Sequence, residues 1–502
     1  MTGVRGRRLA LAVLCTSLLA IVVDNTIVNV ALPTLVRELD ADVSELQWVV
    51  DAYTLVFAGL LLLAGTLGDR YGRRRMLLVG LAVFGASSAA AAYAGSVTWL
   101  IADRAIMGAG AALIMPATLS LLVSVFPDER ERATAVGIWA ATAGLGVALG
   151  PVVGGVLLDH FWWGSVFLVN VPVCAVALAM GLAVVPESRD PTARRIDWSG
   201  AALSGAGLVA LVWAVIEAPS RGWTSPPVLV AGALGVALLT AFVVQQRRAV
   251  APLLDLRLFR DPRFSAASVT IAVLFFALFG FLFVATQYLQ FVLGYAPAAA
   301  GVRVLPYAAA MIVFATLSAR IVASLGARRV VTVGMVLFSA GLAVAATITA
   351  GTGYGRLALA FVLMGAGMGL AGAPATESIT SSLPPERANI GSAVNDTTRE
   401  LGGALGVAVV GSLMASIYAG RLPADASAAA RDSLGAAVAE GPVLAAAARE
   451  AFVHAMSRAS LVVALVAAAG AVVAARHLPV AAGHGKGARG GATSGAATGG
   501  GP

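Results

Sequence analysis

Apolar runs of about 20 residues recur along the whole of this sequence, and they constrain the fold more than any other feature. A run of that length is enough for an α-helix to cross the hydrocarbon core of a bilayer. Hydrophobic residues make up 59% of the 502-residue chain and charged residues only 12%, whereas about a quarter are charged in ordinary soluble domains. The sequence therefore predicts an all-α polytopic membrane protein, without a soluble domain that has a core of its own.

Fourteen such runs are separated when the sequence is cut at proline, glycine and clusters of charge. The first run has a basic head, as a signal peptide does, but it continues to Pro33 without a small-residue cleavage site, so we expect a retained helix. The predicted transmembrane helices cover residues 9–35, 47–68, 76–95, 99–122, 133–158, 163–185, 198–217, 227–246, 265–291, 299–323, 329–350, 356–380, 397–418 and 459–477.

The basic residues alternate between the two sides of the predicted membrane. Of the 34 Lys and Arg residues, 24 fall in the two tails and one set of alternating loops, and 7 fall in the other set. Because cytoplasmic loops carry the excess of basic residues, both termini are predicted to be cytoplasmic, which requires an even number of helices. The loop 419–458 is then exterior, and its Ala-rich pattern could form an interfacial helix.

An internal repeat relates the two ends of the chain. Helices two to five correspond to helices ten to thirteen, so the seventh and eighth helices are an inserted pair. Parallel repeats of six helices are typical of transporters that hold one site between two halves and work by rocking of these halves. The repeat consists of LGDRYGRRRMLLVG (67–80) with VASLGARRVVTVG (322–334), MGAG (107–110) with MGAG (364–367), and FPDER (126–130) with LPPER (383–387).

The predicted organisation follows from this repeat. Its parts are a six-helix half over residues 1–197, an inserted helix pair with a cytoplasmic linker over 198–264, a second six-helix half over 265–480, and a disordered Gly-rich cytoplasmic tail over 481–502.

The charged residues inside predicted membrane helices include Asp24 in the first and Arg104 in the fourth. Intramembrane ionisable residues usually face a bundle interior or a water cavity, and they often relay protons. Burial favours the neutral form of a carboxyl group, so Asp24 is a candidate proton carrier, and Arg104 is its natural counter-charge. The alternative is a structural carboxyl group that is bonded to a neighbouring helix.

Further polar residues of the apolar runs are candidates for the lining of a substrate cavity. Asp51 is as well explained by a position near the outer water, beside an aromatic belt of Trp48 and Tyr53. A charged group at the start of helix thirteen, Asp396, Arg399 and Glu400, instead indicates an ion-pair cluster on the interior side. The candidate cavity residues are Asn25, Asn29, Asp51, Gln287, Gln290 and Glu377.

Four local motifs resemble those of the major facilitator superfamily, and with the inserted pair the chain is similar to its fourteen-helix drug:proton antiporter branch. Helix one reads DNTIVNVALP from Asp24 to Pro33, and helix four carries Arg104 with Gly108 and Gly110, although Met107 replaces the usual Gln. The loop motif consists of Gly65, Asp69, Arg70, Gly72, Arg73 and Arg74. The motif associated with exporters consists of Gly146, Gly150, Pro151, Gly154 and Gly155.

The resemblance implies roles for these motifs. Asp69 would gate the cytoplasmic side by capping a helix or by pairing with an Arg across the seam between the halves. The second copy of the loop has Ala323 at that place, so such a lock is one-sided. The glycines at 146, 150 and 154 would offer a smooth stripe on which the halves slide, and Pro151 would allow a kink.

The predicted function is proton-driven export of amphipathic drugs or antibiotics across a bacterial cytoplasmic membrane by a monomer. The alternatives are an exporter of an endogenous metabolite, such as a self-made antibiotic, lipid or siderophore, and a non-transporting receptor or scaffold. The sequence has no GxxxxGK[ST] phosphate loop, and the glycines at 367, 369 and 372 lie in an apolar helix, which argues against ATP and dinucleotides. We expect no enzyme activity, cofactor or metal site. We also expect no nucleic-acid partner, since the net charge of +8 is scattered over short loops.

Overall fold

The computed structural model describes residues 4–189, 196–382 and 388–478. Within these residues, fourteen helices are long and apolar enough to cross a membrane, which confirms the predicted number and the all-α polytopic fold. The first-half helices are α1 (Val4–Leu39), α2 (Val43–Tyr71), α3 (Arg73–Ala92), α4 (Val97–Val125), α5 (Glu129–His160), and the broken pair α6 (Ser165–Leu168) and α7 (Asn170–Val184). The inserted pair is α8 (Trp198–Arg221) and α9 (Pro226–Arg248), followed by the 3₁₀ turn η1 (Leu256–Arg260).

The second half begins with α10 (Pro262–Gln287), which ends in one π-helical turn, η2 (Tyr288–Val292). Then follow α11 (Pro297–Leu325), α12 (Ala327–Ala345), α13 (Tyr354–Ser381), α14 (Ala388–Ala419), the short helices α15 (Ala428–Asp432) and α16 (Leu434–Ala439), and α17 (Pro442–His477). The last helix begins well before the predicted residue 459, because the preceding Ala-rich segment is a strong helix former. The predicted disordered tail, residues 481–502, lies outside the described residues.

The internal repeat is visible in the tight turns. Gly72 joins α2 to α3 with φ +113°, and Gly326 joins α11 to α12 with φ +82°. Only glycine adopts such angles without strain. At Gly72 a side chain would also lie 2.7 Å from the Glu187 carboxylate. The same requirement at two matched positions explains this part of the repeat.

The repeated MGAG segments let one helix of each half approach its neighbours closely. A Cβ atom on Gly108 of α4 would overlap the carbonyl oxygen of Tyr53 on α2, and one on Gly365 of α13 would overlap that of Tyr307 on α11. The two halves therefore pack their equivalent helices in the same way. The domain boundaries at residues 197, 264 and 480 stay predictions.

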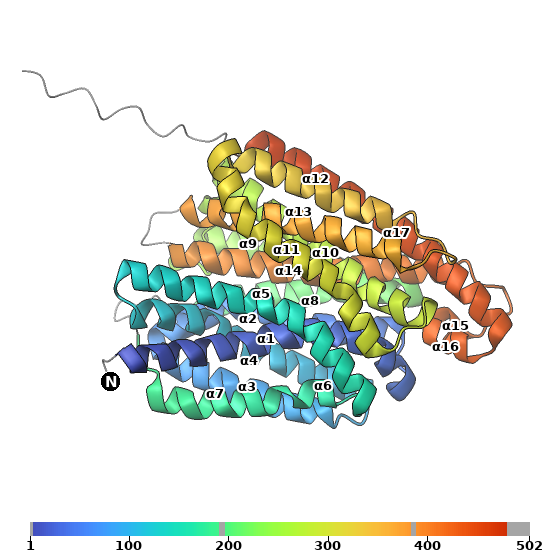
Figure 1. The fold of residues 1–502 in the computed structure, drawn as a ribbon, viewed down its shortest axis with the longest axis horizontal. Coiled ribbons are helices and arrows are strands. Elements are labelled where there is room, and N and C mark those ends of the chain that lie inside the picture. Colours follow the sequence, from blue (N-terminus) through green and yellow to red (C-terminus); the bar gives the residue numbers. More distant parts are fainter. Residues whose placement is uncertain (1–3, 190–195, 383–387, 479–502) are drawn as a thin grey trace, which may run out of the picture.

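Two seams join the halves, and the inserted pair covers one of them. At the first seam α5 packs on α11, and at the second α2 packs on α14. Helix α8 contacts both helices of the second seam: Ser44 of α2 donates to Glu217 at 2.9 Å, and Ser412 of α14 donates to the carbonyl oxygen of Val215 at 2.7 Å. In Figure 1, α5 and α11 lie in front and α8 and α9 behind them.

The two ends of the bundle differ. Figure 1 shows the start of α1 and the end of α17 at one end, and α15 and α16 at the opposite end. This arrangement follows from an even number of crossings. Part of the predicted exterior loop thus forms two short helices, which Tyr418 ties down by donating to the carbonyl oxygen of Ala430 at 3.0 Å.

Candidate functional site: a buried ion pair beside a central cavity

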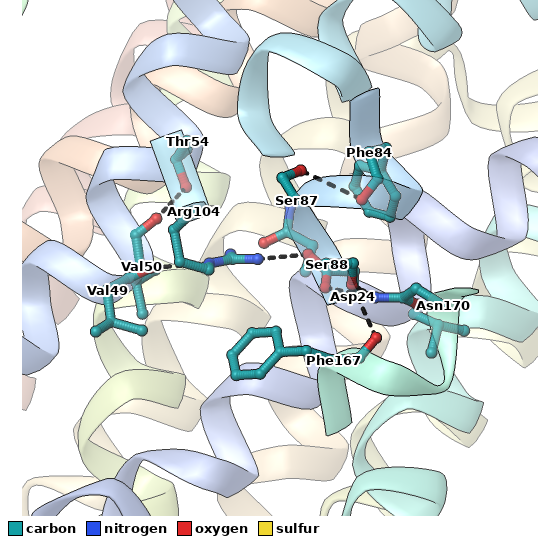
Figure 2. Close-up of polar contacts among 12 residues, drawn as sticks. Asp24, Val49, Val50, Thr54, Phe84, Ser87, Ser88, Arg104, Phe167 and Asn170 are labelled. Atoms are coloured by element: carbon teal, nitrogen blue, oxygen red, sulfur yellow. Dashed lines mark hydrogen bonds and ion pairs between the residues drawn. The ribbon is translucent and has the colours of Figure 1, made fainter. Parts of the chain in front are cut away.

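Asp24 and Arg104 form a buried ion pair inside the first half. Arg104 Nη1 donates to Asp24 Oδ2 at 2.5 Å, and the two side chains are 1% and 0% exposed (Figure 2). Asp24 lies on α1 and Arg104 on α4, so the pair joins two helices of the first half. The contact is the one that the sequence suggested, whereas the role of the pair in proton coupling stays a prediction.

The other carboxylate oxygen of Asp24 is held by a residue that sequence reasoning missed. Asn170, at the start of α7, donates from Nδ2 to Asp24 Oδ1 at 2.9 Å and to Ser88 Oγ of α3 at 3.2 Å. Ser88 in turn donates to the carbonyl oxygen of Phe167 at 2.8 Å (Figure 2). The available signal was an Asn in an apolar run, two residues before Pro172.

Arg104 is fixed by more than its carboxylate. Its Nε donates to the carbonyl oxygen of Val49 at 3.0 Å, and its guanidinium lies 4.3 Å from the centre of the Tyr53 ring. A cation over an aromatic face is attracted by the ring quadrupole. Gly108, one turn further along α4, permits this close approach to α2, because a side chain there would collide with Tyr53.

A cavity of about 200 Å³ lies between the two halves, next to this pair but separate from it. Helices α1 and α5 of the first half and α10, α11 and α14 of the second supply most of its lining, which is largely apolar. Asp24 does not line it, because its side chain points toward α4 and α7, while the neighbouring Asn25 does. The polar lining residues are Asn25, Thr26, Asn29, Thr286, Asp396, Arg399 and Glu400.

The internal repeat extends to this cavity. Four of the six residues of α1 that line it have lining counterparts on α10, 257 positions later: Ile21 and Leu278, Val22 and Phe279, Asn25 and Leu282, Asn29 and Thr286. At the same offset Asp24 corresponds to Phe281, and Arg104 to Phe361. These two phenylalanines pack edge to face with ring centres 6.0 Å apart. An aromatic contact thus stands in the second half where the first half has its ion pair.

Four of the six predicted cavity residues do not line the cavity. Gln287 and Gln290 are buried and donate to backbone carbonyl oxygens, those of Phe283 at 3.0 Å and Val30 at 2.9 Å. Glu377 is exposed on α13. The fourth is Asp51, and only Asn25 and Asn29 are placed as expected.

Asp51 lies on α2, fully buried, rather than in an interfacial aromatic belt. Within the described residues, neither of its carboxyl oxygens has a hydrogen-bond partner. Gln47 and Leu55, one helical turn on either side, contact α14 and the α8–α14 cluster respectively. Asp51 therefore lies on a stretch of α2 that packs against α8 and α14, which the pattern of α2 alone could not reveal.

The charged group of α14, expected as an ion-pair cluster on the interior side, lines the cavity, and its position on the interior side stays a prediction. Arg399 Nη1 lies 3.8 Å from Asp396 Oδ1, and its guanidinium lies 4.5 Å from the centre of the Phe275 ring. Glu400 also faces the cavity. The spacing at i, i+3 and i+4 places the three residues on one face of the helix. It does not indicate whether that face meets a neighbouring helix or the cavity. Across the described segments, no group of three His, Cys, Asp or Glu residues could hold a metal ion.

The loop motif is engaged within its own half. Asp69 accepts two hydrogen bonds from Arg73, at 2.8 and 3.0 Å, rather than one from an Arg across the seam. Arg73 N–H donates to the carbonyl oxygen of Ser188, and Arg74 N–H donates to Glu187 at 3.1 Å. Arg70 is exposed. The motif therefore ties the α2–α3 turn to the segment after α7, and the gating role of Asp69 stays a prediction.

Most of the exporter motif contacts α1 and not the opposite half. Side chains at Gly146, Gly150 and Gly154 would meet Val22, Thr26 and Ile27 of α1. The expected sliding surface between the halves is therefore wrong for this stripe. The motif reaches the second half only through Pro151 and Gly155: a Cβ atom on Gly155 would lie 2.5 Å from the Cα atom of Ala298 on α11.

The sequence profile of the Major Facilitator Superfamily matches residues 14–407. The chain belongs to this superfamily. It is 38% identical over 410 residues to the multidrug resistance protein Stp of Mycobacterium tuberculosis, covering 80% of this chain and 74% of Stp. It is 36% identical to the multidrug efflux pump LfrA of Mycolicibacterium smegmatis, covering 85% and 86%. It is 37% identical to the tetracenomycin C resistance and export protein of Streptomyces glaucescens, covering 83% and 77%.

A solved transporter structure has a similar fold. The chain resembles a bacterial homologue of the human lysosomal transporter Spinster with a TM-score of 0.68 at 17% identity, over 95% of this chain and 98% of the other. At this identity the likeness extends to the fold alone. Superfamily membership and the fourteen apolar helices identify a multi-pass membrane transporter rather than an enzyme.

Proposed function

We propose that this protein is a proton-coupled antiporter that exports amphipathic drugs or antibiotics from the cytoplasm. The observation that carries the proposal is the buried Asp24–Arg104 pair, whose Asp24 lies on α1, a helix that also lines the cavity between the halves. A buried carboxylate and its counter-charge are costly in a membrane protein, and such groups commonly serve proton transfer. The named multidrug and antibiotic exporters among its relatives support the direction and the class of substrate.

The cavity suits an amphipathic substrate. Its walls are mainly apolar, with phenylalanine and methionine side chains from both halves, namely Phe57, Met115, Phe275, Phe279, Met311 and Met368. A small number of polar groups among apolar walls is the usual design of a small-molecule site. Methionine side chains adapt to substrates of different shape.

Proton and substrate use different groups in this proposal, and α1 couples them. Asp24 is enclosed by α4 and α7, whereas Asn25 and Asn29 of the same helix face the cavity. Protonation of Asp24 would weaken its attraction to Arg104 and loosen α1 from α4. That movement would alter the cavity wall, so the two fluxes are linked without contact between proton and drug.

The proposal includes an orientation in the membrane and an oligomeric state. Both termini lie in the cytoplasm, since the basic residues concentrate on that side. The cavity is complete within one chain, which supports a monomer. The proposed antiporter needs no cofactor and is driven by the proton gradient.

A second candidate is export of an antibiotic that the producing cell makes itself. It is favoured by the names of two relatives from Streptomyces, the tetracenomycin C protein and a methylenomycin A resistance protein that is 37% identical. The machinery would be the same. A biosynthetic cluster beside the gene, with export of its product, would distinguish this case.

The test is proton movement coupled to transport in proteoliposomes. We expect an imposed pH gradient to drive uptake of ethidium, a fluorescent amphipathic cation, and Asp24→Asn to abolish this uptake while ethidium binding is retained. The substituted amide mimics the protonated carboxyl group at nearly the same volume. The matched control is Asp159→Asn at the exposed end of α5. Unchanged gradient-driven transport in Asp24→Asn would contradict the assignment of Asp24.

A further inference from the structure

We propose that Asn170 is a positioning residue for proton coupling: it holds Asp24 in its ionised form and thereby sets the pH at which the transporter takes up its proton. The inference rests on the proposed function, in which Asp24 carries the proton. It concerns a residue outside the motifs of the sequence, on a helix that contributes nothing to the cavity lining.

Asn170 owes its place to a break in the sixth membrane crossing. Helix α6 ends at Leu168 and α7 begins at Asn170, so the helix is interrupted at Val169. Pro172 contributes to the break, because it has no N–H group to donate to the carbonyl oxygen of Leu168. The Asn170 amide is directed toward Asp24 of α1 and Ser88 of α3, and the side chain is 2% exposed.

The hydrogen bonds around Asn170 have a fixed direction. The Ser88 hydroxyl group donates its hydrogen to the carbonyl oxygen of Phe167, so its oxygen can only accept a hydrogen bond from Asn170. Asn170 Nδ2 has two hydrogens, one for Ser88 and one for Asp24 Oδ1. Asp24 Oδ1 must therefore be an acceptor without a hydrogen of its own. Because Oδ2 accepts from Arg104, both oxygens of Asp24 are acceptors, and this arrangement favours the carboxylate over the neutral acid.

The surroundings of Asp24 contain few other groups that could set its ionisation. Arg104 approaches from α4, the Tyr53 ring from α2, and Cys174 from α7. Residues 76–92 of α3, 133–158 of α5 and 264–287 of α10 contain no Asp, Glu, Lys, Arg or His. Glu400 lies on the opposite half, in the cavity lining. Arg104 supplies the charge, and Asn170 is the one neutral side chain that donates to the carboxylate in this site.

Removal of the amide should therefore make Asp24 easier to protonate. A donor to the charged form of an acid stabilises that form, and its loss favours the neutral form. From the strength of hydrogen bonds to charged groups, we expect Asn170→Leu to move the pH of half-protonation of Asp24 upward by about one to two pH units. Ser88→Ala should move it in the same direction but less, because Asn170 loses only the acceptor that orients it.

The experiment is infrared difference spectroscopy of the full-length protein in lipid, titrated with pH. The band of a protonated carboxyl group is assigned to Asp24 by its disappearance in Asp24→Asn. The midpoint of that band is then compared in wild type, Asn170→Leu, Ser88→Ala and the control Ser87→Ala. Ser87 is the neighbour of Ser88, is also buried, and bonds only within α3. The pH profile of ethidium transport is recorded for the same variants.

Higher midpoints in Asn170→Leu and Ser88→Ala, with Ser87→Ala at the wild-type value, would support the positioning role. A wild-type midpoint in both Asn170→Leu and Ser88→Ala would overturn it while leaving the proposed function intact. If no band is lost in Asp24→Asn and wild-type transport ignores the pH gradient, the proposed function fails and this inference fails with it. Should Asn170→Leu not fold, Ser88→Ala with its control decides alone.

Discussion

Two carboxyl groups are buried in the first half, and their surroundings are opposite. Asp24 receives hydrogen bonds from Arg104 and Asn170, whereas Asp51, in the part of the chain that the structure describes, receives none. A buried polar group without a partner costs free energy that a bonded one does not. Asp24 therefore has a reason to be ionised, and Asp51 has a reason to be neutral.

This difference predicts an effect on stability. Asp51→Leu, which keeps the side-chain shape and removes both unbonded oxygens, should stabilise the folded protein by about 1–3 kcal/mol. The measurement is thermal unfolding of the purified protein in detergent. Thr54→Val, one turn along α2, is the control, because Thr54 already bonds to its own helix through the Val50 carbonyl oxygen. A lower unfolding temperature in Asp51→Leu would show that the carboxyl group has a stabilising partner.

At the scale of elements, the two helices of the inserted pair, α8 and α9, are joined at one end by Asp197. This side chain accepts hydrogen bonds from Gly200 N–H at 2.8 Å, Gln245 at 2.9 Å and Gln246 at 2.6 Å. Burial alone would raise the pKa of the Asp197 carboxyl group, but the hydrogen bonds from Gly200, Gln246, Ser199 and Gln245 together lower the pKa below its usual value. One carboxylate thus joins the start of α8 to the end of α9.

The lowered pKa gives the anchor a defined pH dependence. Because the folded state favours the ionised group, its contribution is present above the unfolded pKa, near 3.9, and is lost as pH falls through the lower folded value. We expect Asp197→Ala to lower the unfolding temperature at neutral pH, and the gap from wild type to close below about pH 4. Ser199→Ala, which removes only one of the donors, should have a smaller effect. A gap that does not depend on pH would mean that packing, rather than charge, fastens the pair.

The sequence predicted where the helices lie along the chain better than it predicted which neighbours their faces contact. The count of fourteen helices and the repeat follow from local patterns. Each membrane-spanning segment must form its backbone hydrogen bonds within itself and must be long enough to cross the hydrocarbon core. The Asp24–Arg104 contact was also predictable, since two opposite charges in a bilayer favour each other strongly. A single helix pattern does not state which neighbour each face meets. For that reason the sequence did not predict that Glu400 lines the cavity, or that Gly150 contacts α1 rather than the opposite half.

At the scale of the whole molecule, the membrane orientation can be tested directly. The split of 24 against 7 basic residues predicts that reporter fusions at Pro186 and in the C-terminal tail report the cytoplasm, and that one at Ser427 reports the exterior. Ser427 begins α15, at the end of the bundle opposite the start of α1 (Figure 1). A cytoplasmic signal from Ser427 would contradict the fourteen-helix topology.

The inserted pair makes the two seams mechanically unequal. Helix α8 is bonded to α2 at Glu217 and to α14 at Val215, so it bridges the halves along one edge. Along the other edge, α5 packs directly on α11, and Gly155 lies against Ala298. Halves that rock apart would therefore stay joined by α8 along the α2–α14 edge and would separate between α5 and α11.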